Sequence, residues 1–145
     1  MSKQFSLQAA VEPVLSRYSK TSLVKRWEEA VSYVETEPIA FWIRESGEIV
    51  NIVWLTRYDI RDITLFKETG TSTFNLTLLS AIIGVEVREG DDAARHRGLN
   101  VSGDYLVDIH TSFQGAGLIW VASDEKEVAG LRKFVDQVFR LLPKR

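Results

Sequence analysis

The amino-acid sequence is poorest in the residues that carry covalent and metal chemistry. It has no cysteine, which excludes a disulfide framework, a thiol nucleophile and a cysteine-based metal site. Its histidines are His96 and His110 only, too few and too far apart in the pattern to predict a zinc site. We therefore expect no metal and no other cofactor.

Long hydrophobic runs are also missing. The longest, such as residues 52–55, fall far short of the ~20 apolar residues that cross a bilayer. The N-terminal stretch lacks the unbroken apolar core of a signal peptide, because Gln8, Glu12 and Pro13 interrupt it. A soluble, cytoplasmic protein is expected, and the absence of cysteine fits a reducing compartment.

An excess of positive charge is absent as well. The net charge of -2 over 145 residues gives no general attraction for nucleic acid, so no nucleic-acid partner is expected. A membrane-surface contact through Lys20, Lys25 and Arg26 is a weaker alternative, because Glu28 and Glu29 follow directly. The hydrophobic fraction of 45% is that of an ordinary globular protein with one substantial core.

Two helices are predicted at the start of the chain. Apolar residues recur at helical spacing from Leu7 to Tyr18. Pro13 interrupts this stretch, which predicts either a helix that begins near Glu12 or a helix with a kink. A second apolar stripe runs from Leu23 to Val34 and predicts a second helix.

From Pro38 the apolar period changes from that of a helix to that of a strand. Seven strands are predicted, at residues 39–44, 48–55, 60–67, 73–78, 83–88, 105–110 and 118–122. Short turns such as Glu45-Ser46-Gly47 join most of them, which favours antiparallel neighbours. The polar interval between Gly90 and Asp104 is predicted to be a surface loop.

A single helix is predicted to close the chain. Asp124 and Glu127 form a D-x-x-E capping pattern, and an apolar stripe continues to Leu142 before Pro143 ends it. Arg140 near the carboxyl end suits the helix dipole. A helix this apolar on one side must cover something, and the strands offer the only large surface.

Seven antiparallel strands followed by one amphipathic helix resemble the pleckstrin-homology-like barrel, in which two near-orthogonal sheets are plugged by that helix. The resemblance covers about residues 38–142, and the predicted turn at Leu55-Thr56-Arg57 looks like that of bacterial members. It implies an α+β, mainly β fold: a seven-stranded antiparallel barrel at residues 38–145, capped by the C-terminal helix. Residues 1–37 would be an N-terminal helical extension.

The same resemblance implies binding of phospholipid headgroups, peptides or protein partners. The loop Glu45-Ser46-Gly47-Glu48 disfavours the headgroup, because its two carboxylates would repel an inositol phosphate. A partly open barrel would also leave one strand edge beside the final helix, where an extended peptide can add by main-chain pairing.

Two groups of residues are candidates for binding. Asp108 and His110 share one face of a predicted strand and could hold a metal ion or a proton between them, or form a solvated polar face. The second group is Arg88 with the loop residues Arg95, His96 and Arg97. A guanidinium group can bind two oxygens of one phosphate, so this group predicts contact with an anion or phosphate. The alternative is a loop of mixed charge that binds no ligand.

The four tryptophans, Trp27, Trp42, Trp54 and Trp120, are predicted to pack in the core. Trp42 and Trp54, on neighbouring strands, are expected to pack together or against the final helix.

The sequence favours a non-enzymatic interaction module, because no serine has a nucleophile-elbow context and no glycine loop precedes a helix. The expected partner is a protein or peptide, or a second copy in a homo-oligomer, bound through the barrel edge and the helices. The alternative is a small-ligand carrier or enzyme with a pocket between a curved sheet and the final helix.

Overall fold

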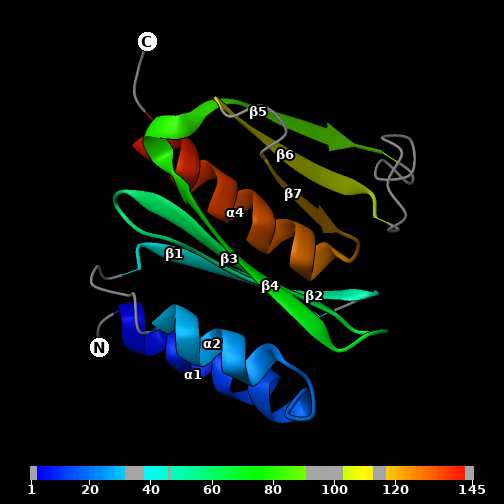
Figure 1. Ribbon diagram of the computed structural model, residues 1–145. Helices are drawn as coiled ribbons and strands as arrows, with labels where there is room; N and C mark the ends of the chain where they lie inside the picture. Colours follow the sequence, from blue (N-terminus) through cyan, green and yellow to red (C-terminus); the bar gives the residue numbers. More distant parts are fainter. Residues whose placement is uncertain (1–2, 32–37, 46, 91–102, 113–116, 143–145) are drawn as a thin grey trace. The chain divides into compact units, whose positions relative to one another are not determined.

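The computed structural model describes residues 3–31, 38–45, 47–90, 103–112 and 117–142. The chain divides into two compact units, Met1–Thr77 and Leu78–Arg145. Each unit contains one antiparallel sheet with helical packing on one face (Figure 1). The expected α+β class and the antiparallel pairing are therefore confirmed. The strands form two separate sheets, with the orders β1-β2-β3-β4 and β5-β6-β7.

The elements follow the predicted order closely. The first unit contains α1 (Lys3–Arg17), α2 (Leu23–Val31), β1 (Ala40–Arg44), β2 (Ile49–Leu55), β3 (Asp59–Phe66) and nearly all of β4 (Thr71–Leu78). The second contains η1 (Leu79–Ala81), β5 (Ile82–Glu89), β6 (Tyr105–Thr111), β7 (Gly117–Ala122) and α4 (Glu125–Leu141). The division of the chain thus groups α1 and α2 with the first four strands.

In the first unit, α1 and α2 cover one face of the sheet (Figure 1). The core beneath them consists of buried apolar side chains: Leu7, Val11, Val14, Leu23, Ala30, Val50, Ile52, Trp54, Ile63 and Leu65. Trp54 lies fully buried among them, edge-on to Trp27 at 5.6 Å and tilted against Phe74 at 6.4 Å between ring centroids. The two N-terminal helices and the sheet therefore share one core.

Pro13 lies inside α1, which starts at Lys3, so of the two predicted alternatives the start near Glu12 is wrong and a helix that contains Pro13 is found. An interior proline removes one backbone hydrogen bond and costs ~3 kcal/mol. Val11 and Val14, on either side of it, are buried against the sheet. Burial of this apolar stripe offsets the cost of the proline and keeps the helix continuous.

The register of β1 and β2 separates Trp42 from Trp54. Trp42 lies opposite Val53, and Trp54 lies opposite Phe41. Opposite residues in an antiparallel pair point to the same face, so Trp42 and Trp54 point to opposite faces of the sheet. The expectation that they pack together is therefore wrong, although both are buried as predicted.

In the second unit, α4 packs on the face of the sheet that carries Trp120 (Figure 1). Trp120 is fully buried and meets Phe134 of α4 edge-on, with ring centroids 5.5 Å apart. The apolar stripe of α4 is buried with it: Leu131, Phe134, Val135 and Val138. This confirms that the final helix covers a sheet.

The start of α4 is held by the predicted cap. The side chain of Asp124 accepts a hydrogen bond from the backbone N–H of Glu127 at 2.8 Å, and its own backbone is extended. Glu125 and Glu127 lie in the first turn, where their charges complement the positive end of the helix dipole. Arg140 lies in the last turn, as the dipole favours.

Replacing Asp124 by alanine should lower the free energy of unfolding by about 1 kcal/mol, because an N–H of the first turn loses its acceptor. The matched control is Lys126→Ala, an exposed change in the same turn, which should stay within ~0.5 kcal/mol of the wild type. Urea denaturation followed by circular dichroism measures both. Equal losses in the two variants would contradict the cap.

Candidate functional site

The register of the second sheet gathers charged side chains on one face. Glu86 of β5 lies opposite Asp108 of β6, Arg88 lies opposite Leu106, and His110 lies opposite Gly84. The intervening positions on the two strands hold Val85, Val87, Val107 and Ile109. Val107 lies opposite Trp120, which contacts α4, so this set is on the face that α4 covers. The charged residues therefore point to the other face, because side chains alternate along a strand. We call Glu86, Arg88, Asp108 and His110 the charged face.

The charges on this face alternate in sign. Glu86 and Asp108 are directly opposite each other, an arrangement that is unfavourable for two carboxylates. Each carboxylate has a basic neighbour on its own strand. The Nε of Arg88 donates to Oε1 of Glu86 at 2.8 Å, and Nε2 of His110 lies 3.6 Å from Oδ2 of Asp108. The guanidinium of Arg88 therefore balances the carboxylate of Glu86, and the imidazole of His110 lies beside the carboxylate of Asp108.

The two strands expose their charges to different degrees. On β6 the side chain of Asp108 is 6% exposed, while that of His110 is 47% exposed. On β5 the side chains of Glu86 and Arg88 are 41% and 46% exposed. On β5 both charged side chains can therefore contact a partner. On β6 the imidazole of His110 can, but the buried carboxylate of Asp108 cannot.

Glycines flank His110 on both neighbouring strands. Gly84 lies opposite it on β5, and a Cβ at that position would meet nothing within 4 Å. Gly117 lies opposite it on β7, where a Cβ would come within 2.9 Å of the carbonyl oxygen of Ile109. The imidazole thus has no side chain directly beside it across either strand.

At the other end of the same face the side chains are buried. Leu106 and Val121, which are opposite each other, form a small buried cluster. Gly103 lies directly over Val121, because a Cβ there would fall 2.0 Å from Cγ1 of that valine. The accessible part of the face is therefore the β5 side, His110, and Ile119 of β7, which lies opposite Asp108 and is 40% exposed.

Strand β5 is the end strand of its sheet in the described part of the chain. Its only strand neighbour there is β6, so the outward main-chain groups of β5 face away from the sheet. Apolar side chains on it are exposed as well, with Ile83 57% and Val87 40% exposed. The other end strand, β7, buries Leu118, Trp120, Val121 and Ala122, and exposes Ile119 at 40%.

A contact with α4 holds the carboxyl end of β5. Arg132 forms an ion pair with Glu89, and its guanidinium lies 5.2 Å from the ring centroid of Tyr105. Burial raises the pKa of Tyr105 above its ordinary value, while the charge of Arg132 opposes that change. The phenol is thus kept protonated against the sheet.

The raised pKa of Tyr105 predicts a loss of stability in alkali. The folded protein holds the phenolic proton more tightly than the unfolded chain, so the tyrosine has no effect below pH ~10. Above it the unfolded chain ionises first and folding weakens. The stability of the wild type should therefore fall more steeply than that of Tyr105→Phe as the pH rises above ~10. Urea denaturation across this range measures it, and parallel curves would contradict it.

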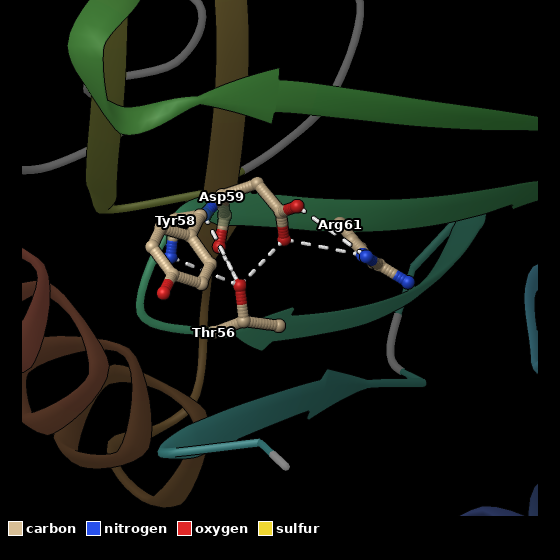
Figure 2. A network of polar contacts seen from close by, with 4 residues as sticks. All are labelled: Thr56, Tyr58, Asp59 and Arg61. Carbon is tan, nitrogen blue, oxygen red and sulfur yellow. Dashed lines mark hydrogen bonds and ion pairs between the residues drawn. The ribbon is translucent and has the colours of Figure 1, made fainter. Parts of the chain in front are cut away.

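A second polar cluster lies at the hairpin between β2 and β3, where the sequence predicts a turn. Figure 2 shows Thr56 at its centre. The hydroxyl of Thr56 donates to Oδ1 of Asp59 at 2.8 Å and accepts the backbone N–H groups of Tyr58 and Asp59. Arg61 donates to both carboxylate oxygens of Asp59, at 3.1 and 3.3 Å.

The hairpin cluster stabilises the turn. The side chains of Asp59 and Arg61 are less than one-tenth exposed, and their contacts with each other and with Thr56 lie within the hairpin (Figure 2). The backbone N–H of Thr56 also donates to the carbonyl of Asp59 at 2.9 Å, which closes the turn. Tyr58 is 62% exposed at the tip. The polar groups are thus used to hold the turn.

Replacing Thr56 by alanine should lower the free energy of unfolding by about 1–3 kcal/mol, because the buried Asp59 carboxylate loses a donor. The control is Thr56→Ser, which keeps the hydroxyl and should lose clearly less. Guanidinium denaturation followed by tryptophan fluorescence measures both. If serine and alanine were equally destabilising, the hydroxyl contacts would not be the cause.

A third polar cluster lies on the face of the first sheet opposite α1 and α2. Asn51 is opposite both Arg44 and Thr64, and all three point to that face. The Nδ2 of Asn51 donates to the hydroxyl of Thr64 at 3.0 Å, and that hydroxyl donates to Asp62. Oδ1 of Asn51 is buried without a hydrogen-bond partner among the described residues. Because Arg44, Asn51 and Asp62 are all buried, this cluster is less accessible than the charged face.

Of the predicted site residues, the structure brings Arg88, Asp108 and His110 together on the charged face. Arg95, His96 and Arg97 lie outside the described residues. The sequence analysis missed Glu86 as a site residue. Its signal was its position two residues before Arg88 on the same strand, which places both on one face.

Within the described ranges, no three His, Asp or Glu side chains gather closely enough to hold a metal ion. The helices described here include none with the length and apolar character needed to cross a membrane.

Comparison of the chain with protein-family models, curated proteins and solved structures finds no match in any of the three.

Proposed function

We propose that this chain is a non-enzymatic interaction module, in which the edge of β5 pairs with an extended segment of a protein or peptide partner. The observation that carries the proposal is the exposed end strand of the second sheet. An end strand presents a row of unpaired N–H and C=O groups, which is a template for adding another strand. The main chain would supply affinity, and the alternating side chains would supply specificity.

The side chains of β5 suit this role because they differ between the two faces. Glu86 and Arg88 are partly exposed on the charged face, and Val87 is exposed on the opposite face. An added strand would meet opposite charges on one side and an apolar side chain on the other. Cross-strand pairs of these kinds contribute roughly 0.2–1 kcal/mol each.

Among the described strands the first sheet ends in β1 and β4, and β4 is the more exposed of the two. Strand β4, from Thr71 to Leu78, contains no charged residue, and it exposes Leu76 at 44% and Leu78 at 51%. An edge without charges offers no ion pair that would favour one register, so β4 offers less to select a particular partner. We therefore place the binding edge at β5.

The order of four strands, three strands and a final helix supports a relation to pleckstrin-homology-like barrels, which we also propose. Such a relation would agree with the binding of peptides or proteins. The alternative of a small-ligand site beneath α4 has less support, because the side chains that α4 buries are apolar: Leu131, Phe134, Val135 and Val138. Binding pockets usually include a few polar groups that orient the ligand.

The proposal is tested by selecting a phage-displayed library of linear random peptides on the full-length protein. Synthetic copies of the enriched peptides are then added during hydrogen–deuterium exchange. The expected result is protection of backbone amides between Gly84 and Glu89. Protection of β4 or of any other element instead, or failure to enrich peptides, would refute the proposal.

The side-chain contribution is measured by fluorescence anisotropy of a labelled peptide. Arg88→Ala should lower the affinity for the peptide about 2- to 5-fold, because one cross-strand charge pair is lost. The matched control is Thr73→Ala, an exposed change on β4, which should leave affinity unchanged. Equal effects of the two changes would place the peptide elsewhere.

A further inference from the structure

The exposed part of β5 is complementary to itself in charge. Lysines alone on an edge strand would repel a second copy, which is how many proteins keep such edges apart. Here Glu86 and Arg88 have opposite charges and lie two residues apart on one face. An antiparallel copy of the strand can therefore place each charge opposite its counterpart.

Two features limit the segment that can pair regularly. The register with β6 shifts between Ile82 and Gly84, so Ile83 is the extra residue of a bulge. Bulges disrupt pairing on an edge strand. At the other end, Gly90 has a φ of 143°, a conformation that L residues rarely adopt. The regular segment runs from Gly84 to Glu89, and Val87 lies inside it, three residues from Gly84 and two from Glu89.

We propose that the partner of β5 is β5 of a second copy, paired antiparallel about a two-fold axis at Val87. This proposal rests on the proposed function, because it uses the same edge. Glu86 of each copy then lies opposite Arg88 of the other, so two ion pairs form on the charged face. Two-fold interfaces are the commonest in homo-oligomers, because one self-complementary patch is sufficient.

On the opposite face of the paired strands, this register brings apolar side chains together and leaves no unpaired charge beside them. Val87 lies opposite Val87 of the second copy, so two side chains that are each 40% exposed cover one another. Val85 lies opposite Glu89, whose carboxylate is already paired with Arg132 of its own chain. The two sheets join into one continuous sheet with β5 of each copy at its centre.

Neighbouring registers are less favourable. An axis at Glu86 places the two Glu86 carboxylates directly opposite each other, and like charges in that position are destabilising. An axis at Val85 brings Ile83, the bulged residue, into the paired segment. Only the axis at Val87 both avoids the bulge and pairs opposite charges.

Charge reversal tests the proposal by sedimentation equilibrium of the full-length protein. Arg88→Glu and Glu86→Arg should each weaken dimerisation at least about tenfold, because each change converts two attractive pairs into two repulsive pairs. The double variant E86R/R88E restores opposite charges across the axis and should dimerise like the wild type. Lys133→Glu, exposed on α4, makes the same net charge change as Arg88→Glu and should have no effect.

Single cysteines read the register directly, because the protein has none of its own. Residues directly opposite each other have Cα atoms about 4.5–5.5 Å apart, within the range that a disulfide spans. Val87→Cys should form a disulfide-linked dimer under mild oxidation, and Val85→Cys and Glu86→Cys should not. Preferential cross-linking at position 85 or 86 would overturn the register.

The outcomes separate this proposal from the proposed function. A protein that stays monomeric, or whose double variant fails to recover, overturns the self-pairing. If selected peptides still protect the amides of Gly84 to Glu89, the edge binds a different partner and the proposed function stands. Loss of both results would refute both.

Discussion

Each sheet of this protein depends on helices that remove one of its faces from water. A fully buried tryptophan lies at the centre of each contact: Trp54 beneath α1 and α2, and Trp120 beneath α4. Truncation of such a side chain typically costs about 3–5 kcal/mol, more than any cap or surface ion pair in the molecule contributes. Helix packing thus buries one face of each sheet and leaves the strand edges to other roles.

Polar groups inside the first unit are held by local contacts, with a few exceptions. Thr56, Asp59 and Arg61 form hydrogen bonds with one another within one hairpin (Figure 2). The indole N–H of Trp54 and Oδ1 of Asn51, in contrast, are buried without a hydrogen-bond partner in the described part of the chain. Unpaired buried groups of this kind each cost about 1–3 kcal/mol. The apolar core around Trp54 is large enough to offset them.

The exposed edge of β5 combines attraction with selectivity. An uncharged apolar edge pairs with many strands and leads to aggregation, whereas charges of both signs favour only certain registers. The ion pair between Glu86 and Arg88 within one strand is available for exchange with a partner, because both side chains are about half exposed. Arg132 and Tyr105 hold the end of the same strand against α4. The edge is thus both accessible and fixed in shape.

Local patterns in the sequence predicted much of this fold. Apolar periodicity located the strands and helices, and the Asp124 pattern located the start of α4, because both depend on residues a few positions apart. They did not decide whether the helix begins near Glu12 or continues through Pro13, because burial against a distant sheet outweighs the local cost of a proline.

The sequence by itself also determined that Glu86 and Arg88 share a face, as do Asp108 and His110, because side chains alternate along any strand. Only the tertiary structure decided that Glu86 lies opposite Asp108, that Trp42 and Trp54 point to opposite faces, and that β5 ends its sheet. Register and strand order depend on pairing between segments far apart in the chain, and no local preference encodes that pairing.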